Sequence, residues 1–328
     1  MRIEGKKTLV TGAGGFIGSH LVEVLVRMGA KVSVFVRYNS RSDLGLMERL
    51  PQEIKGEIEV FAGDLKDPEA LRRPVKRSEL VMHLGSLIAI PYSYINPMDF
   101  VQTNVVGTAN FLNVCMGSGM EKIVHTSTSE VYGTATYSPI DEDHPLQAQS
   151  PYSATKIAAD KLVESYYRSF GLPVAIARPF NTYGPWQSAR AVIPTIILQA
   201  LHGDRVMLGS LNPTRDLTFV EDTVSGLIEV AKSERSIGEV VNIGSGNEVS
   251  IGGLAHSISS MMGQEIQILK DERRVRPDKS EVERLVCDNS KAKKLLGWEP
   301  RVSLEEGLRR TIDWFRSKVG EHRTTYAI

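Results

Sequence analysis

The chain of 328 residues has only two cysteines, Cys115 and Cys287. They lie far apart and lack the spacing of metal ligands, so we expect no disulfide framework, no metal site and a reducing compartment. Residues 1–15 contain no apolar segment of the signal-peptide kind, and no run approaches the roughly 18 apolar residues of a membrane-spanning helix. We therefore expect a cytoplasmic protein without a membrane partner.

An excess of charge of one sign is also lacking, since 39 basic residues balance 39 acidic ones. A balanced charge gives no reason to expect nucleic acid or another polyanion as a partner. We find no repeat, low-complexity tract or flexible linker, and 41% of the residues are hydrophobic. That composition provides a sizeable core, in one large domain or two moderate ones.

Short apolar runs alternate with helical periods in the first half of the chain. The pattern predicts helices at 17–27, 104–119 and 152–171, and strands at 7–12, 31–37, 58–64, 79–85, 122–128 and 173–179. This alternation predicts an α/β fold, a Rossmann-like doubly wound parallel sheet. We assign 1–180 to a dinucleotide-binding domain to which some later segments return. Residues 181–320 form a smaller, interleaved α/β substrate-binding domain, and 321–328 a frayed tail.

Three glycines, Gly12, Gly15 and Gly18, directly follow the first predicted strand and open the first predicted helix. Glycines at such a turn let the backbone approach a pyrophosphate, whose charge lies at the helix N-terminus. The alternative is a turn that only packs the helix against the sheet. The strand before and the helix after favour a phosphate loop for a nicotinamide dinucleotide, NAD or NADP.

The Gly-x-x-Gly-x-x-Gly spacing resembles that of the extended short-chain dehydrogenases/reductases. The family residue that matches Asp64 contacts the adenine, although an Asp here could also cap a turn. The resemblance implies further cofactor contacts from Phe16, Ile17, Leu65, Leu84, Tyr152 and Lys156.

The second predicted strand ends in Arg37, near the place where NAD-binding proteins carry an acid for the ribose. A guanidinium suits the 2′-phosphate of NADP, so the sequence slightly favours NADP over NAD. The alternative is that Arg37 stacks on the adenine of NAD.

Tyr152 and Lys156 are four residues apart, which sets both on one face of a predicted helix. A free tyrosine has a pKa of about 10, and we expect the nearby ammonium and the positive nicotinamide ring to lower it. Thr128, at the end of the fifth predicted strand, is placed to hydrogen-bond the same substrate hydroxyl. The family resemblance assigns these three residues to oxidation of a carbinol.

Glu130 indicates more than oxidation. After oxidation at sugar carbon 4, the proton on carbon 5 is acidified, and a carboxylate can remove it and return it to the hydroxyl leaving carbon 6. Thr128-Ser129-Glu130 resembles the Thr-Ser-Glu of GDP-mannose 4,6-dehydratases, whereas dTDP-glucose 4,6-dehydratases have an acidic Asp where Ser129 stands. Glu130 must then act as both base and acid, or use a water. UDP-glucuronate decarboxylases share the triplet, and a plain salt bridge is another alternative.

The segment 178–185 resembles the family segment whose Asn meets the diphosphate of a nucleotide sugar. Arginine pairs bidentately with a diphosphate, so two converging arginines suit this ligand. The candidate substrate-binding residues are Asn181, Arg190, Val192, Arg215 and Arg276, with Asp222 in the same motif as Arg215. We expect residues 192–194 to form an apolar wall against the nucleobase.

From Thr8 to about Trp314 the chain is most similar to nucleotide-activated N-acetylglucosamine 4,6-dehydratases of the legionaminic acid type. The resemblance rests on segments 35–45, 127–135, 140–156 and 178–197. We therefore predict a lyase, a 4,6-dehydratase of a UDP- or GDP-linked sugar. A 4-epimerase, a decarboxylase and a dinucleotide-sensing regulator are the alternatives. The resemblance also implies a homodimer through helices at about 100–117 and 152–170.

Overall fold

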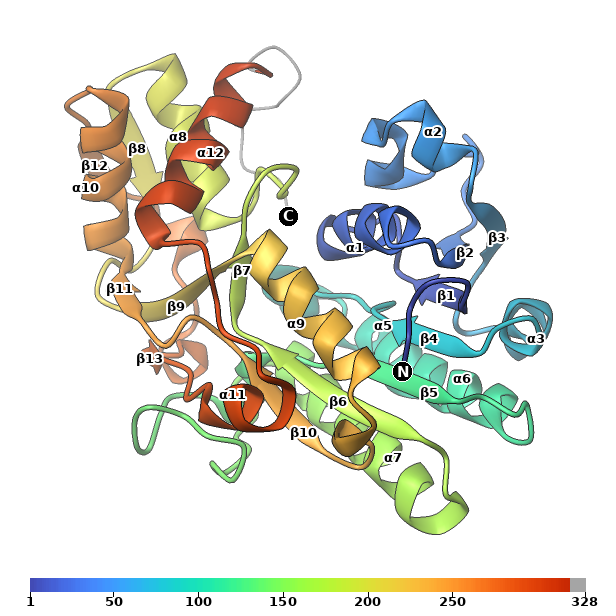
Figure 1. Ribbon diagram of the computed structural model, residues 1–328. Helices are drawn as coiled ribbons and strands as arrows, with labels where there is room; N and C mark the ends of the chain where they lie inside the picture. The colour runs from blue at the N-terminus through green and yellow to red at the C-terminus, as the bar shows by residue number, and fades with distance from the viewer. Residues whose placement is uncertain (319–328) are drawn as a thin grey trace.

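The computed structural model describes residues 1–318, so the predicted tail at 321–328 lies outside the described residues. Within that range the chain forms a seven-stranded parallel sheet in the order β10-β6-β5-β4-β1-β2-β3 (Figure 1). Its strands are β1 (Lys7–Thr11), β2 (Lys31–Arg37), β3 (Glu59–Gly63), β4 (Leu80–His83), β5 (Lys122–Thr126), β6 (Val174–Pro179) and β10 (Val240–Ile243). The predicted Rossmann-like sheet is confirmed, and β10 joins it from late in the chain.

Helices cover both faces of this sheet, which explains why its central strands are apolar throughout rather than alternating. Figure 1 shows α1 (Phe16–Arg27) and α9 (Val220–Lys232) on one face. The other face carries α3 (Pro68–Lys76), α6 (Gly107–Cys115) and α7 (Pro151–Phe170). Leu21 and Leu227 belong to the core under the first face, and Phe111 and Val163 to the core under the second.

The later part of the chain builds a smaller region beside the carboxyl ends of the large sheet. Its strands are β7 (Asn181–Tyr183), β8 (Arg205–Leu208), β9 (Thr214–Phe219), β11 (Glu248–Ser250), β12 (Gln267–Lys270) and β13 (Arg284–Leu285). Its helices are α8 (Val192–His202), α10 (Ile251–Met262) and α12 (Leu304–Arg316), whereas α11 (Ser290–Leu296) packs against β10 and α9.

Short elements connect these layers. They are η1 (Gly45–Arg49), α2 (Gln52–Lys55), α4 (Ile90–Ile95), α5 (Pro97–Phe100), η2 (Val101–Val106), η3 (Ser129–Tyr132), η4 (Glu234–Ser236), η5 (Glu272–Arg274) and η6 (Asp278–Ser280). The helix predicted within 104–119 begins earlier than expected and ends at the glycine-rich stop that closes this segment. It begins at Pro97, where the Asn96 side chain caps it, and it ends at Cys115 before Gly117 and Gly119, which have positive φ.

The start of α7 is fixed by its own sequence. Ser150 and Ser153 form a reciprocal capping box, and Pro151 occupies the first helical position. Gly171 ends the helix in the left-handed conformation. These local signals hold Tyr152 and Lys156 in the first turns of a rigid element, next to the end of β5.

Candidate active site

The first part of the site is the loop between β1 and α1. Gly12 has φ 72°, and a Cβ there would lie 2.8 Å from the backbone nitrogen of Gly85. A Cβ on Gly18 would collide with the carbonyl oxygen of Gly12. Only glycine fits these positions, and no side chain caps the N-terminus of α1 at Gly15. The loop therefore has the shape and the free N-terminal amides that a pyrophosphate needs.

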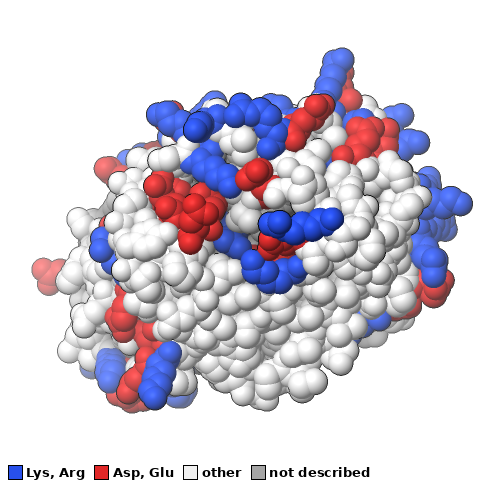
Figure 2. Space-filling view, turned by 90° about the horizontal axis from the view of Figure 1, so that it is seen from below, with Lys and Arg blue, Asp and Glu red and all other residues white. Residues whose placement is uncertain are grey.

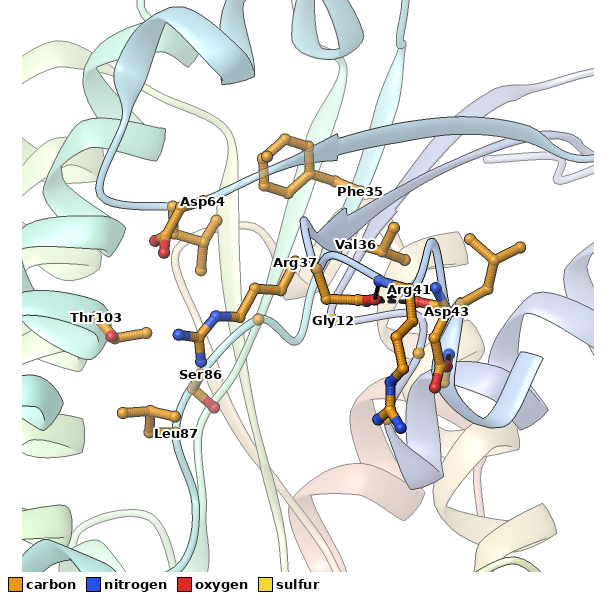
Figure 3. A pocket seen from close by; sticks show the side chains of 18 residues that line it. Gly12, Phe35, Val36, Arg37, Arg41, Asp43, Asp64, Ser86, Leu87 and Thr103 are labelled. Atoms are coloured by element: carbon orange, nitrogen blue, oxygen red, sulfur yellow. Dashed lines mark hydrogen bonds between the residues drawn. The ribbon is translucent and has the colours of Figure 1, made fainter. Parts of the chain in front are cut away.

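A cavity of about 420 Å³ opens beside this loop, at the carboxyl ends of β1, β2 and β4. Of the residues predicted to bind the cofactor, those that line it are Gly12, Gly15, Arg37, Asp64 and Leu65 (Figure 3). Phe16, Ile17 and Leu84 pack against the core instead of lining the cavity, and Gly18 packs under Gly12. In a doubly wound sheet this edge is the usual position of a dinucleotide, and the glycine cradle fits that group.

Arg37 ends β2 as an exposed side chain, and both Arg37 and Arg41 line the cavity (Figure 3). The nearest acid in the chain, Asp43, accepts a hydrogen bond from the backbone nitrogen of Gly45. The cavity wall after β2 therefore presents two guanidinium groups. This geometry agrees with either a 2′-phosphate or a stacked adenine next to Arg37.

Asp64 stabilises a turn and also lines the cavity, while its contact with the adenine stays a prediction. Its Oδ1 accepts a hydrogen bond from the backbone nitrogen of Lys66 at 2.9 Å, which stabilises the turn after β3. Its side chain is half-buried and also lines the cavity. The Lys66 ammonium lies 3.6 Å from Oδ2.

Two features of this cavity were not expected from the sequence. The loop after β2 folds on Asn39, whose Oδ1 accepts hydrogen bonds from the backbone nitrogens of Arg41 and Asp43. The buried Asn104 binds both backbone groups of Leu87 and the hydroxyl of Thr155, and so ties the cavity wall to α7. The signal for Asn104 was a polar side chain within an apolar helical period.

The second part of the site lies at the end of β5. Thr128 caps η3, where its hydroxyl accepts a hydrogen bond from the backbone nitrogen of Glu130. Burial raises the pKa of the Tyr152 phenol, the side chain of Thr128 acts in the opposite direction, and the carboxylates of Glu130 and Asp160 raise the pKa further. The structure thus brings Thr128, Glu130 and Tyr152 into one electrostatic neighbourhood.

The expected lowering of the Tyr152 pKa by Lys156 and the nicotinamide ring stays a prediction for the cofactor-bound protein, because burial is the largest influence on both groups in the structure. The Lys156 ammonium donates to the carbonyl oxygen of Thr126 at 2.8 Å. Burial lowers its pKa to about 8, and Asp160, one turn further along α7, acts against that shift. Burial thus acts against the charged form of both the Tyr152 phenol and the Lys156 amine.

Asp160 anchors a buried polar network behind the catalytic pair. It accepts hydrogen bonds from Ser127 at 2.8 Å and from Arg178 at 3.1 Å. His125 lies 3.4 Å from its other oxygen, and burial lowers the pKa of that histidine. The network joins β5, β6 and α7, and so fixes the distance between Lys156 and the strand end that carries Thr128.

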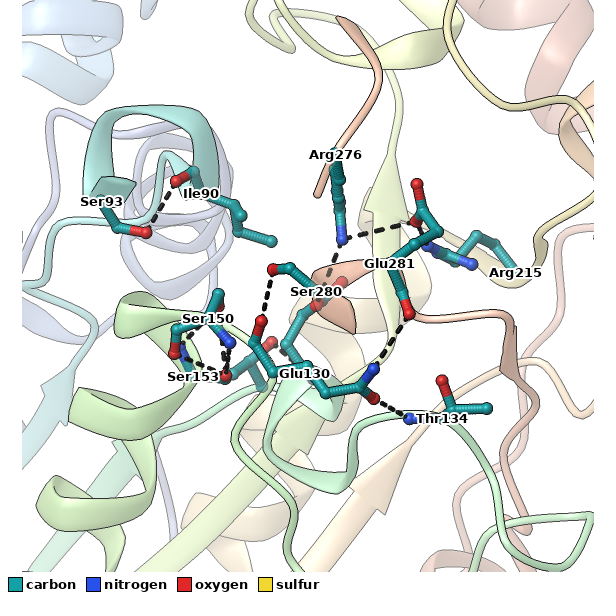
Figure 4. A network of polar contacts seen from close by, with 12 residues as sticks. Ile90, Ser93, Glu130, Thr134, Ser150, Ser153, Arg215, Arg276, Ser280 and Glu281 are labelled. Carbon is teal, nitrogen blue, oxygen red and sulfur yellow. Dashed lines mark hydrogen bonds and ion pairs between the residues drawn. The ribbon is translucent and has the colours of Figure 1, made fainter. Parts of the chain in front are cut away.

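Glu130 is buried and faces the smaller region of the molecule. Its Oε2 lies 3.7 Å from Nη1 of Arg276, which is 3.8 Å from Oε1 of Glu281 (Figure 4). Nη2 of Arg215 lies 3.3 Å from the same oxygen of Glu281. Both arginines predicted from the sequence therefore converge on Glu130. Glu281 was not predicted, and no local pattern marks it.

The remaining predicted substrate residues are spread more widely. Asn181 is half-buried in β7, and its Oδ1 has no hydrogen-bond partner. Arg190 is exposed, and Val192 is half-buried at the start of α8. The expected apolar wall at 192–194 is wrong for Ile193, whose side chain belongs to the core.

Two further residues named from the sequence are Asp222 and Ser129. The carboxylate of Asp222 accepts hydrogen bonds from the backbone nitrogens of Arg301 and Val302, so it holds the chain before α12 rather than a substrate. Ser129 is buried in η3 beside Glu130.

Residues 1–318 contain no group of three His, Cys, Asp or Glu side chains that could hold a metal ion. In the same range no helix is both long and apolar enough to cross a membrane.

The glycine cradle and the Thr128, Tyr152 and Lys156 set are the features of an extended short-chain dehydrogenase/reductase. A family model described as GDP-mannose 4,6 dehydratase matches residues 9–311. The chain belongs to this family of extended short-chain enzymes, the NAD-dependent epimerases and dehydratases of nucleotide sugars.

Known relatives span three reactions. A dTDP-glucose 4,6-dehydratase of Streptomyces antibioticus is 33% identical, over 94% of this chain and 92% of that protein. A UDP-N-acetyl-α-D-glucosaminuronate decarboxylase of Bacillus cytotoxicus is 33% identical, over 95% and 98%. A UDP-glucose 4-epimerase of Mycolicibacterium smegmatis is 33% identical, over 95% and 99%. The solved structure of DesIV, a dTDP-glucose 4,6-dehydratase of Streptomyces venezuelae with NAD bound, covers 96% of this chain and 98% of that one, with a TM-score of 0.85 and 29% identity.

Proposed function

We propose that the protein is a sugar-nucleotide 4,6-dehydratase that converts an NDP-N-acetylglucosamine, or a related NDP-hexose, to a 4-keto-6-deoxy sugar. The observation that carries the proposal is the position of Glu130. Its buried carboxylate lies beside the Thr128–Tyr152 pair and faces the two arginines of the substrate side. A carboxylate there is placed for elimination next to the carbon that the pair oxidises.

The oxidation uses residues at the ends of β5 and α7. Tyr152 takes the proton of the carbon 4 hydroxyl, and Thr128 orients that hydroxyl. Lys156 keeps a positive charge near the phenol in its protonated form. A nicotinamide dinucleotide, with its pyrophosphate on the glycine cradle and its adenine near Asp64, would supply reversible hydride storage.

The elimination uses Glu130. Once carbon 4 is a ketone, the carboxylate removes the proton from carbon 5, and the carbon 6–oxygen bond breaks as the double bond forms. Ser129 carries no acidic proton, so Glu130 returns the same proton to the departing hydroxyl, either directly or through a water. One water leaves. The stored hydride then adds to carbon 6 and a proton adds to carbon 5, which gives the 4-keto-6-deoxy sugar.

Substrate binding is proposed for Arg215 and Arg276, which suit the diphosphate, and for Asn181, whose buried oxygen lacks a partner. Arg190 and Val192 are proposed at the nucleobase end. Decarboxylation and 4-epimerisation are second candidates, because relatives carry those names. Glu130 by itself suits either elimination or loss of carbon dioxide.

The test is a mass measurement on the reaction products. The protein is incubated with the UDP- and GDP-linked forms of N-acetylglucosamine and with UDP-glucuronate. Loss of one water supports the dehydratase, whereas an unchanged mass with a new axial isomer identifies an epimerase. Loss of carbon dioxide from the uronate identifies a decarboxylase.

Glu130→Gln separates oxidation from elimination. The variant keeps the shape of the side chain and removes the base, so water loss should fall by about a hundredfold or more. Bound nicotinamide should still become partly reduced, which is followed by its near-ultraviolet absorbance. Undiminished product formation by this variant would contradict the role of Glu130.

We further propose a cytoplasmic homodimer. Cys115 and Cys287 are both unpaired and buried, which suits a reducing compartment. The face seen from below in Figure 1 has a wide area without charged side chains beside one charged hollow (Figure 2). Exposed apolar side chains on the helices predicted to pair are Met98, Val106, Met116, Tyr167 and Phe170. An uncharged face with such side chains suits a contact with a second copy.

A further inference from the structure

Glu281 has no part in the chemistry proposed above, yet it contacts both arginines of the substrate side. Its Oε1 lies 3.3 Å from Nη2 of Arg215 and 3.8 Å from Nη1 of Arg276. On the other side of Arg276, Glu130 lies 3.7 Å away. Figure 4 shows the Arg276 guanidinium between the two carboxylates.

Arg276 is shared between the two carboxylates and bound tightly by neither. Its Nη1 is buried and has no hydrogen-bond partner among residues 1–318, since both oxygens lie beyond hydrogen-bond distance. Charges attract strongly in a site with little water. The near-equal distances therefore indicate that the electrostatic attraction of Arg276 to Glu281 is similar to its attraction to Glu130.

The backbone holds Glu281 independently of its charge. The backbone nitrogens of Ser280 and Glu281 donate to the carbonyl oxygen of Pro277, which closes the turn of η6. Gln149, next to the cap of α7, donates to the carbonyl oxygen of Glu281 at 3.0 Å. The side-chain charge can therefore be removed while the segment 276–281 keeps its main-chain contacts.

We propose that Glu281 is a positioning residue that holds Arg215 and Arg276 in competition with the diphosphate and keeps Arg276 from closing onto Glu130. The proposal rests on the proposed function of Glu130 as the base. A close ion pair with Arg276 would stabilise the carboxylate and make it a weaker base towards carbon 5. The charged and titratable groups around Glu130 are Arg215 on β9, Arg276 and Glu281 on the 276–281 segment, and Tyr152 on α7.

Glu281→Gln tests the positioning of Glu130. The amide keeps the shape of the side chain and an oxygen for Arg215, and it removes only the charge. Water loss should slow by about three- to tenfold, while partial reduction of bound nicotinamide persists. The acidic limb of the pH profile for water loss should move to lower pH. Glu283→Gln, an exposed carboxylate two residues away, is the matched control and should change neither quantity.

A double variant shows whether Glu281 acts through Glu130. In a Glu130→Gln background, Glu281→Gln should cause no further loss of the elimination rate, because the group that it positions is gone. An equal loss in both backgrounds, with the pH profile unmoved, would make Glu281 a structural residue and overturn the proposal.

Binding of UDP and GDP tests the arginines without any reaction. Removing one competing carboxylate should make Glu281→Gln bind the nucleoside diphosphates severalfold more tightly by calorimetry, whereas Glu283→Gln should match the unmodified protein. If Glu281→Gln binds the nucleoside diphosphates more tightly but no nucleotide sugar loses water, the dehydratase is refuted and the interaction of Glu281 with the two arginines is supported. Equal affinity of the variant and the unmodified protein would contradict that interaction.

Discussion

Burial acts on the two central side chains in opposite directions. It raises the pKa of Tyr152 and lowers that of Lys156 to about 8. Their spacing on one helix face is readable in the chain, and the structure confirms that both lie in the first turns of α7. Their burial is not readable from the sequence, because it depends on segments distant in the chain. Ile90 and Phe100 pack with Tyr152, and the end of β5 accepts the hydrogen bond of Lys156.

The lowered pKa of Lys156 predicts a pH effect. Its ammonium is present below about pH 8 and is lost above it, so the rate of nicotinamide reduction should fall as the pH rises through that value. Lys156→Arg keeps its charge at all these pH values, and the alkaline limb should then move upward. Rapid mixing over a pH series measures both limbs. An identical limb in the two proteins would show that another group controls it.

The same shift has a defined sign for stability. The ordinary pKa of lysine, 10.5, applies to the unfolded chain, so that chain binds more protons than the folded one between about pH 8 and 10.5. The contribution of Lys156 to the free energy of unfolding therefore rises with pH across this window.

Arg37 predicts a cofactor preference. If its guanidinium binds a 2′-phosphate, Arg37→Ala should weaken NADP binding by about tenfold or more and change NAD binding little. Equal weakening for both dinucleotides would instead support stacking on the adenine. Fluorescence titration with the two reduced cofactors gives both constants, and Lys31→Ala, an exposed cation at the other end of β2, is the control.

At the scale of elements, α9 crosses over the large sheet and is secured by one lysine of β5. The Lys122 ammonium is fully buried and donates to the carbonyl oxygen of Val230 at 2.6 Å and to the hydroxyl of Ser236 at 2.7 Å. It also donates to the carbonyl oxygen of Ser233. A cation at the C-terminus of a helix is favourable because it satisfies the last carbonyls.

Lys122→Met should destabilise the protein. The variant keeps an apolar stem and leaves buried carbonyl groups without a donor, which costs about 2 kcal/mol of the free energy of unfolding. Urea denaturation measures this loss. The exposed Lys31→Met should stay within about 0.5 kcal/mol of the unmodified protein. A loss no larger than that of the control would show that water replaces the ammonium.

At the scale of the whole molecule, the proposed dimer forms between the faces of two copies that carry α6 and α7. Met98 and Val106 are exposed about two turns apart on the helical stretch that ends at Cys115. The double variant Met98→Glu and Val106→Glu places like charges in that contact and should give a monomer in sedimentation velocity. Tyr137→Glu, an exposed aromatic outside these helices, should leave the dimer intact. A monomer for the unmodified protein would refute the contact itself.

The sequence by itself determined the local elements of this protein. Apolar periods placed the strands and helices of the large sheet, and the glycines after β1 and the Tyr152–Lys156 spacing marked the cofactor and oxidation sites. Backbone periodicity and glycine geometry act over a few residues, so they are readable in the chain.

Only the tertiary structure decided the contacts between distant segments. It set β10 beside β6, assigned Asp222 to the chain before α12, and brought Arg276 between Glu130 and Glu281. It also buried Tyr152 and Lys156, which raises the pKa of the tyrosine and lowers that of the lysine. These results depend on which strand ends the folded sheet and the smaller region bring together, and no local pattern contains that information.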